Sequence, residues 1–352
     1  MAQLHSRKVL YGFSFTFLSA LLTLAGFLFI YSQIAAAEEI AVNGISLKYY
    51  DFSRGRLAFT YNTGKSGDIY VIDFDRLTIS PLLTGSADED YPSWSPDGQK
   101  LAYTSNAGGD RDIYLVNADG SGPKRLTSAK GNDEQPDWSP DGSQLVFRSE
   151  RSAPASSLFI MYQDGTNQRP LGEQLVKVDA SHSFPKWSPR GSEFLFTSND
   201  YWPGWDVLKF NEKTKTTTLM TKGFQSFCRA AWYPAGGAFL LSYGAGAEVD
   251  IWNFEKGGDS IAPLIVRPGR DYDGIWTEDG ERIIFAGELN EGKGDFQLFV
   301  WIKKDNSIHQ IAEGKGAMRF PTWTPIPSLG FLKSNKGQTN GDTPAPSAVT
   351  AK

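Results

Sequence analysis

The sequence predicts an all-β fold built from repeated four-stranded units, because tryptophan recurs at a nearly constant spacing and a similar turn motif follows it. The separations between consecutive repeat tryptophans are 44, 49, 45, 44 and 47 residues. The motif is S-P-D-G twice, then S-P-R-G, Y-P-A-G and T-E-D-G, and it decays to T-P-I-P at the end. A fixed period of this length is typical of repeat architectures. The repeat tryptophans are Trp94, Trp138, Trp187, Trp232, Trp276 and Trp323.

The first complete unit shows the four expected strands in order. A short strand at 91–94 leads into a type I turn at 95–98, where proline presets φ and glycine occupies the fourth position. Further strands are expected at 100–104, 112–116 and 124–127. The third strand recurs in the other units, starting at Asp68, Ser157, Asp206, Asp250 and Gln297. No helix of ordinary length is expected after residue 37.

A four-stranded unit exposes strand edges that it cannot satisfy alone, and radial closure of several units removes them. We therefore predict a six-bladed β-propeller of four-stranded antiparallel blades, with 320–333 as a closing piece that returns to the first blade. A seven-bladed ring completed by 40–50 is the alternative. The repeat tryptophans are expected to fill the wedges between neighbouring blades with large apolar side chains.

Composition excludes several classes of function. The chain has 352 residues and a formal net charge of −5, so no nucleic-acid partner is expected. A single cysteine, Cys228, excludes an intramolecular disulfide, and three histidines are too few for a histidine-rich metal centre. No cofactor is predicted, although a calcium ion bound by acidic loop residues remains an alternative. Those acids are Asp88, Asp90, Asp133, Asp271 and Asp273.

Both ends of the chain are predicted to lie outside the propeller. Arg7 and Lys8 precede an uncharged run at 9–31, and Ala35-Ala36-Ala37 offers a small-residue cleavage site. Residues 1–37 are thus either a signal peptide or a retained signal-anchor, and only the anchor would contact the membrane. Either alternative predicts a periplasmic or otherwise exported chain, in the second case anchored in the inner membrane by 9–31. The propeller is expected at 38–333 and a disordered tail at 334–352.

The motif P-x-W-S-P-D-G, followed by L-A-Y-T-S, a Gly/Asp loop and D-I-Y-L-V, resembles the WD40-like repeat of the TolB β-propeller family. Residues 92–98 and 136–142 match it closely, and the resemblance extends over 50–333. The family implies the propeller fold but hosts varied functions. The chain departs from TolB in the absence of an α/β domain before the propeller. It also lacks the G-x-S-x-G elbow of propeller peptidases and the histidine cluster of propeller lyases.

Two sets of loop residues are candidate binding residues. Loops that enter the innermost strands should ring a central funnel, which we expect to be mixed and rich in acids. A second loop holds aromatic side chains that could anchor a partner or stack on a sugar. The funnel candidates are Asp88, Asp90, Asp133, Gln135, His182, Arg229, Asp271, Asp273 and Arg319. The aromatic candidates are Tyr201, Trp202 and Trp205.

These observations favour a non-enzymatic, exported propeller that binds a protein or peptide in the bacterial cell envelope through its funnel. The alternative is a carbohydrate-binding or carbohydrate-active propeller that uses funnel carboxylates, since paired carboxylates can perform glycosidic chemistry. Two funnel carboxyl groups about 5–10 Å apart would favour that alternative.

Overall fold

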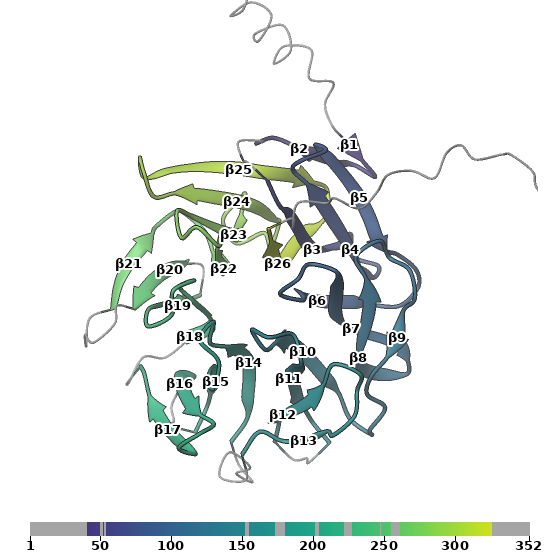
Figure 1. Cartoon of the computed structure of the whole chain (residues 1–352). Helices are drawn as coiled ribbons and strands as arrows, with labels where there is room; N and C mark the ends of the chain where they lie inside the picture. The colour runs from purple at the N-terminus through teal and green to yellow at the C-terminus, as the bar shows by residue number, and fades with distance from the viewer. Residues whose placement is uncertain are drawn as a thin grey trace, which may run out of the picture.

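Six antiparallel sheets surround a central axis in a computed structural model of the chain (Figure 1). The structure describes residues 41–49, 52, 54–151, 155–172, 180–200, 204–221, 227–246, 248–254 and 261–325. Every regular element within these ranges is a strand. The prediction of an all-β, six-bladed propeller is therefore confirmed.

Blades 2 to 5 each consist of four consecutive strands, with the first innermost. Blade 2 contains β6 (Glu89–Trp94), β7 (Lys100–Gly108), β8 (Asp110–Asn117) and β9 (Lys124–Arg125). Blade 3 contains β10 (Asp133–Trp138), β11 (Gln144–Ser149), β12 (Ser157–Tyr162) and β13 (Arg169–Pro170). Blade 4 contains β14 (His182–Trp187), β15 (Glu193–Ser198), β16 (Asp206–Asn211) and β17 (Thr216–Leu219). Blade 5 contains β18 (Phe227–Trp232), β19 (Phe239–Ala245), β20 (Glu248–Phe254) and β21 (Ile261–Ile265).

Blade 1 joins the two ends of the propeller. Its innermost strand is β26 (Ala317–Thr324), and β3 (Arg56–Asn62), β4 (Gly67–Asp73) and β5 (Thr78–Leu83) follow outward. Strands β26 and β3 pair antiparallel from Ala317 opposite Asn62 to Thr324 opposite Arg56. The predicted closing piece thus returns to the first blade, and its strand begins slightly earlier than the sequence indicated.

Blade 6 contains two strands more than the others. It runs outward from β22 (Asp271–Trp276) through β23 (Arg282–Glu288), β24 (Phe296–Ile302) and β25 (Ser307–Gly314) to β2 (Ile45–Leu47) and β1 (Ala41–Val42). Ile45 and Leu47 are fully buried, which explains why this segment covers the outer edge of β25 (Figure 1). The seven-bladed alternative is therefore wrong, because β1 and β2 supply a hairpin to blade 6 and no blade of their own.

The S-P-D-G motif forms the predicted turn. In blade 2 the Gly98 amide donates to the Ser95 carbonyl over 2.8 Å, and Gly98 has a φ of 64° that favours glycine. The Asp97 carboxylate accepts bonds from the Ser95 hydroxyl at 2.6 Å and the Gln99 amide at 3.0 Å. The motif therefore fixes the register with which the innermost strand enters the second strand.

The repeat tryptophans lie between neighbouring blades. Trp138 packs among Ala102 and Ile113 of blade 2 and Leu145 of blade 3, and its Nε1 donates to the Ser93 carbonyl at 3.0 Å. Equivalent apolar clusters of two adjacent blades surround the other five. Trp94, Trp138 and Trp187 are buried, whereas Trp232, Trp276 and Trp323 are half-buried. The structure thus gives these side chains a packing role.

Within the ranges described above, the structure contains no helix long and apolar enough to cross a membrane. The predicted export segment at 1–37 and the predicted tail at 334–352 lie outside the described residues. The described strands of the propeller extend from Ala41 to Thr324.

Candidate functional site

Each innermost strand contains a bulge three residues before its repeat tryptophan. The bulge residue has a φ between 51° and 61° in all six blades, although none is a glycine. The strand pairing shifts at this point in every blade, for example between Asp90 and Ser93 of blade 2. We name these six residues the floor ring: Tyr91, Gln135, Phe184, Arg229, Asp273 and Phe320.

In most blades the residue that follows the bulge suits the interrupted strand pairing. Four of the six are prolines (Pro92, Pro136, Pro185 and Pro321), and the others are Ala230 and Gly274. Proline has no amide hydrogen, so it loses nothing at a position where the ladder is interrupted. All six floor-ring side chains line one small cavity of about 70 Å³ on the axis. The bulges therefore turn one side chain of each blade toward the axis.

Aromatic rings and one guanidinium close the centre of the propeller. The rings of Tyr91 and Phe320 lie 4.2 Å apart, and those of Tyr91 and Phe184 lie 6.3 Å apart. The Arg229 guanidinium lies 4.6 Å from the Phe320 ring centre and 4.9 Å from that of Phe184. Cation–π contacts of this kind strengthen when they are shielded from water. The floor ring thus closes the bottom of the funnel.

Asp273 is the buried anion of the floor ring. Its carboxylate pairs with Arg229 and with Arg319, the latter at 2.9 Å, and accepts a bond from the Phe320 amide at 3.2 Å. Burial acts to raise the pKa of this carboxyl, but the two guanidiniums outweigh it and hold the pKa below its ordinary value. Asp273 is therefore ionised and forms ion pairs with both arginines.

Above the floor ring lies a funnel cavity of about 730 Å³. Its charged lining consists of Arg148, Arg229, Arg270, Arg319 and one acid, Glu134. The aromatic lining consists of Phe184, Trp205, Tyr272 and Phe296. This lining differs from the acid-rich funnel expected from the sequence, because most of the predicted acids point into ion pairs within or between the blades.

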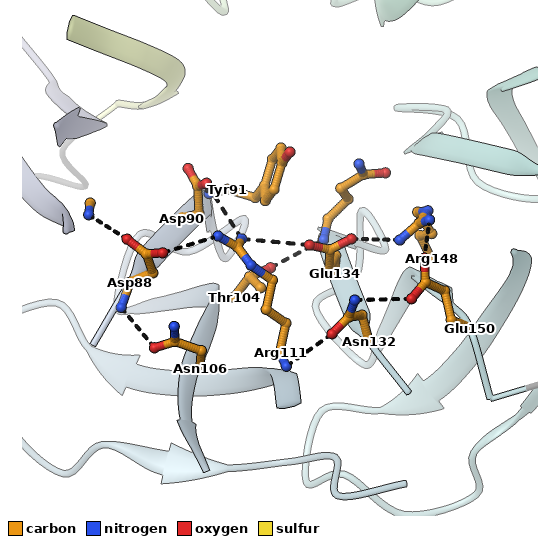
Figure 2. A network of polar contacts seen from close by, with 12 residues as sticks. Asp88, Asp90, Tyr91, Thr104, Asn106, Arg111, Asn132, Glu134, Arg148 and Glu150 are labelled. Atoms are coloured by element: carbon orange, nitrogen blue, oxygen red, sulfur yellow. Dashed lines mark hydrogen bonds and ion pairs between the residues drawn. The ribbon is translucent and has the colours of Figure 1, made fainter. Parts of the chain in front are cut away.

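The wall formed by blades 2 and 3 carries a network of ion pairs. Figure 2 shows Arg111 among Asp88, Asp90 and Glu134, each at 3.5 Å. The network continues from Glu134 to Arg148 at 2.5 Å, and Arg148 also pairs with Glu150 at 2.5 Å. Burial raises the pKa values of Asp90 and Glu134 despite these cations. Four carboxylates share two guanidiniums here, so this network has a formal charge of −2, and its members Glu134 and Arg148 line the cavity.

The opposite wall contains an arginine whose charge is balanced. Arg270 pairs with Glu288 at 2.5 Å, and the Glu288 carboxylate also accepts bonds from the amides of Gly292 and Gly294. These bonds, first that from Arg270, lower the pKa of Glu288 to about 2. The pair is electrically neutral and shapes the cavity between Tyr272 and Phe296.

The predicted funnel residues fall into two groups. Gln135, Arg229, Asp273 and Arg319 lie together at the floor of the cavity. Asp88 and Asp90 belong to the wall network, whereas Asp133, His182 and Asp271 are buried between strands. Their partners are Arg151 for Asp133 at 2.5 Å, the Ser198 hydroxyl for His182 at 3.0 Å and Arg267 for Asp271 at 2.7 Å.

The aromatic loop contributes one described residue to the funnel. Trp205 is half-buried and lines the cavity. Tyr201 and Trp202 lie outside the described residues, so their prediction remains untested. Among the residues that the structure describes, no group of three or more His, Cys, Asp or Glu side chains could hold a metal ion. The calcium alternative gains no support from these residues.

Sequence reasoning missed half of the floor ring and most of the cavity lining. The floor-ring residues Tyr91, Phe184 and Phe320 occupy the third position before Trp94, Trp187 and Trp323, so the repeat itself contained the signal. The lining residues Arg148, Arg270 and Phe296 come from other strands and loops, and no local pattern marks them.

Glu89, the first residue of β6, gives a prediction about the pH dependence of stability. Its side chain is buried, the Ser105 hydroxyl donates to Oε1 at 3.2 Å, and Oε2 has no partner among the described residues. Burial raises the pKa of Glu89 to about 7. Because the folded pKa exceeds the ordinary value, the ionised carboxylate costs stability as the pH rises from about 4.5 through 7. We expect Glu89→Gln to increase the free energy of unfolding at pH 8 by about 1–3 kcal/mol.

The measurement is urea unfolding of both proteins at pH 4 and pH 8. The gain should vanish at pH 4, where the wild-type side chain is protonated in the folded and unfolded states. A gain of equal size at both pH values would show that the effect comes from packing rather than from ionisation.

Comparison with known proteins identifies the fold in solved structures but finds no curated relative. TolB from Acinetobacter baumannii is 18% identical with a TM-score of 0.66, covering 77% of this chain and 67% of that chain. A structure of the nidogen/laminin complex is 9% identical with a TM-score of 0.60, covering 77% and 99%. An oligogalacturonate lyase in complex with manganese is 14% identical with a TM-score of 0.50, covering 74% of each chain. No curated protein matches significantly.

The fold and the site define a closed six-bladed propeller with a charged, aromatic funnel above a plugged axis. The family model PD40, the TolB beta propeller domain, matches residues 50–227, which is half of the chain. The chain therefore belongs to the TolB β-propeller family, and the resemblance stated from the sequence is confirmed.

Proposed function

We propose that the chain is an exported, non-enzymatic propeller that binds a protein or peptide partner through its funnel in the bacterial cell envelope. The funnel cavity is the observation that carries this proposal. Its volume of about 730 Å³ lies in the range of pockets that bury most of the surface of a small ligand or side-chain group. Its lining combines tryptophan, tyrosine and arginine, the side chains that dominate the energetics of protein interfaces.

Two further observations support the proposal. The axis below the cavity is plugged by the floor ring, so a bound segment would rest on a rigid base. One of the similar structures is a complex of two proteins, nidogen and laminin. The proposal that the chain is exported rests on the basic residues and the uncharged run near the N-terminus, which are typical of a targeting segment.

The carbohydrate alternative finds less support in the geometry. Glycosidic chemistry commonly requires two carboxyl groups that flank the bond. Among the described residues that line the cavity, Glu134 is the one carboxylate, and it is held by Arg148 and Arg111. The arrangement favours binding over acid–base chemistry.

A capture experiment with matched variants tests the proposed function. The protein would be immobilised and exposed to envelope extract, beside a funnel variant and a rim variant. The funnel variant carries Trp205→Ala and Arg148→Ala, which remove lining side chains. The rim variant carries Tyr162→Ala, an exposed residue at the far end of the strand pair that holds Arg148.

We expect a partner that the wild type and the rim variant capture and that the funnel variant loses. Thermal unfolding of all three proteins would show that the variants are folded. Equal capture by the funnel variant and the wild type would contradict binding in the funnel.

A further inference from the structure

We propose that the funnel floor binds a carboxylate of the partner peptide, at Arg229 and Arg319. This inference rests on the proposed function and specifies its ligand chemistry. The carboxylate can come from the end of a chain or from an acidic side chain, and the experiment below separates these sources.

The charge balance of the floor is the first argument. Arg229 and Arg319 both pair with the carboxylate of Asp273, so these three side chains have a formal charge of +1. The two arginine side chains are 19% and 21% exposed and line the cavity, whereas the Asp273 side chain is 5% exposed. The net positive charge of the three therefore lies on the cavity side, where reduced solvation strengthens its attraction for an anion.

The other two lining arginines differ in this respect. Arg270 is balanced by Glu288 and Arg148 lies between Glu134 and Glu150. An incoming carboxylate would meet net repulsion at Arg148 and a neutral pair at Arg270. The floor is thus the part of the cavity lining with a net positive charge.

Arg319 also has N–H donors that are available to a ligand. Its Nε donates to Asp273 Oδ2 at 2.9 Å, and its two terminal NH2 groups donate to no residue that the structure describes. A guanidinium binds a carboxylate best through two parallel N–H donors. Two terminal nitrogens at the floor of an open cavity provide such a pair.

The position of Arg319 is already fixed by stacking. Its guanidinium lies 4.4 Å from the ring centre of Phe296, 5.0 Å from that of Tyr272 and 5.1 Å from that of Phe320. A group held in this way loses little conformational freedom when it binds. The same rings offer apolar contact to the peptide atoms next to the carboxylate.

The negative wall suggests how the rest of the peptide is arranged. Asp88, Asp90, Glu134 and Glu150 outnumber Arg111 and Arg148 on blades 2 and 3 (Figure 2). Glu134 and Arg148 of this network line the cavity, and the network as a whole has more acidic than basic side chains, whereas the floor has a net positive charge. A peptide with a basic side chain near its carboxylate would complement both.

Three matched peptides test the carboxylate. All carry an uncharged dye at the N-terminus, and fluorescence anisotropy reports binding to the protein. The first is Gly-Lys-Ala-Gly-Ala-Ala with a free C-terminal carboxylate, and the second is its C-terminal amide. The third is the amide with aspartate in place of the second glycine. We expect the first or the third to bind at least about tenfold more tightly than the second, since a charge-assisted pair typically contributes that much.

The binding order identifies the source of the carboxylate. Preference for the first peptide assigns a chain end, and preference for the third assigns an acidic side chain. Equal affinity for all three, or no binding by any, would overturn the inference.

Two variants of the floor give opposite predictions. Arg319→Gln leaves one cation and one anion, so we expect carboxylate binding to weaken by about tenfold. Asp273→Asn removes the competing anion and leaves two cations, so binding should strengthen. A merely structural role would make both variants bind worse. Arg169→Gln, which removes an outer-blade arginine paired with Glu212, is the matched control and should change nothing.

Asp273→Asn keeps the test informative if Arg319→Gln folds poorly. Weaker carboxylate binding by a folded Asp273→Asn protein would also contradict the inference. Failure of the carboxylate inference is distinguishable from failure of the proposed function. If all peptides bind equally and the Trp205→Ala and Arg148→Ala variant weakens all of them, funnel binding stands and the carboxylate inference falls.

Discussion

A chain that ends at Gly316 is expected to lose the cooperative unfolding transition of the full chain. This truncation removes β26, which supplies the innermost strand of blade 1. The strand buries Met318 and places Phe320 and Trp323 in the floor ring and in the cluster of Phe52 and Phe74. Burial of these three side chains contributes about 5–9 kcal/mol, which is comparable to the whole stability of an ordinary protein.

Loss of β26 would also leave β3 as an open edge in the centre of the molecule. Circular dichroism during thermal and urea unfolding is the measurement. A chain that ends at Lys333 is the control, because it keeps β26 and removes only the predicted tail. A cooperative transition of nearly wild-type midpoint in the shorter chain would show that ring closure does not hold the propeller together.

Trp138→Ala is expected to lower the free energy of unfolding by about 3–5 kcal/mol. The side chain is 6% exposed and fills the wedge between blades 2 and 3, so its removal leaves a cavity that two rigid sheets cannot close. It also leaves the Ser93 carbonyl without its Nε1 donor.

Urea unfolding monitored by circular dichroism measures this effect, with Tyr162→Ala of the same blade as the control. Tyr162 is 46% exposed, so its replacement should cost less than about 0.5 kcal/mol. Equal costs for both substitutions would contradict the wedge role of the repeat tryptophans.

Much of the fold could be predicted because each repeat is marked by a tryptophan and a turn motif that are close together in the sequence. The tryptophan spacing defines the blades, and Ser95, Asp97 and Gly98 form the turn that their types demand. The return of the last segment to the first blade followed from the need to close sheet edges. The extra hairpin on blade 6 did not follow, because the apolar pair Ile45 and Leu47 suits an edge cover as well as a new blade.

The candidate site could be predicted only in part, because it forms where residues of different blades meet. Gln135, Arg229, Asp273 and Arg319 were identified from their loops and do converge at the floor. Asp133 and Asp271 have the same loop context, yet their carboxylates pair with Arg151 and Arg267 and are fully buried. Sequence spacing cannot show such pairing, so the cavity lining was expected to be mixed and rich in acids, whereas its charged residues are four arginines and one glutamate.

Site-specific photocrosslinking in cells tests the central claim, that a partner binds in the funnel, most directly. A benzophenone amino acid would replace Trp205, which lines the cavity, or Tyr162, which lies outside it. Binding in the funnel predicts a light-dependent protein adduct from position 205 that is absent from position 162. An adduct from position 162 alone, or adducts of equal yield from both positions, would contradict it.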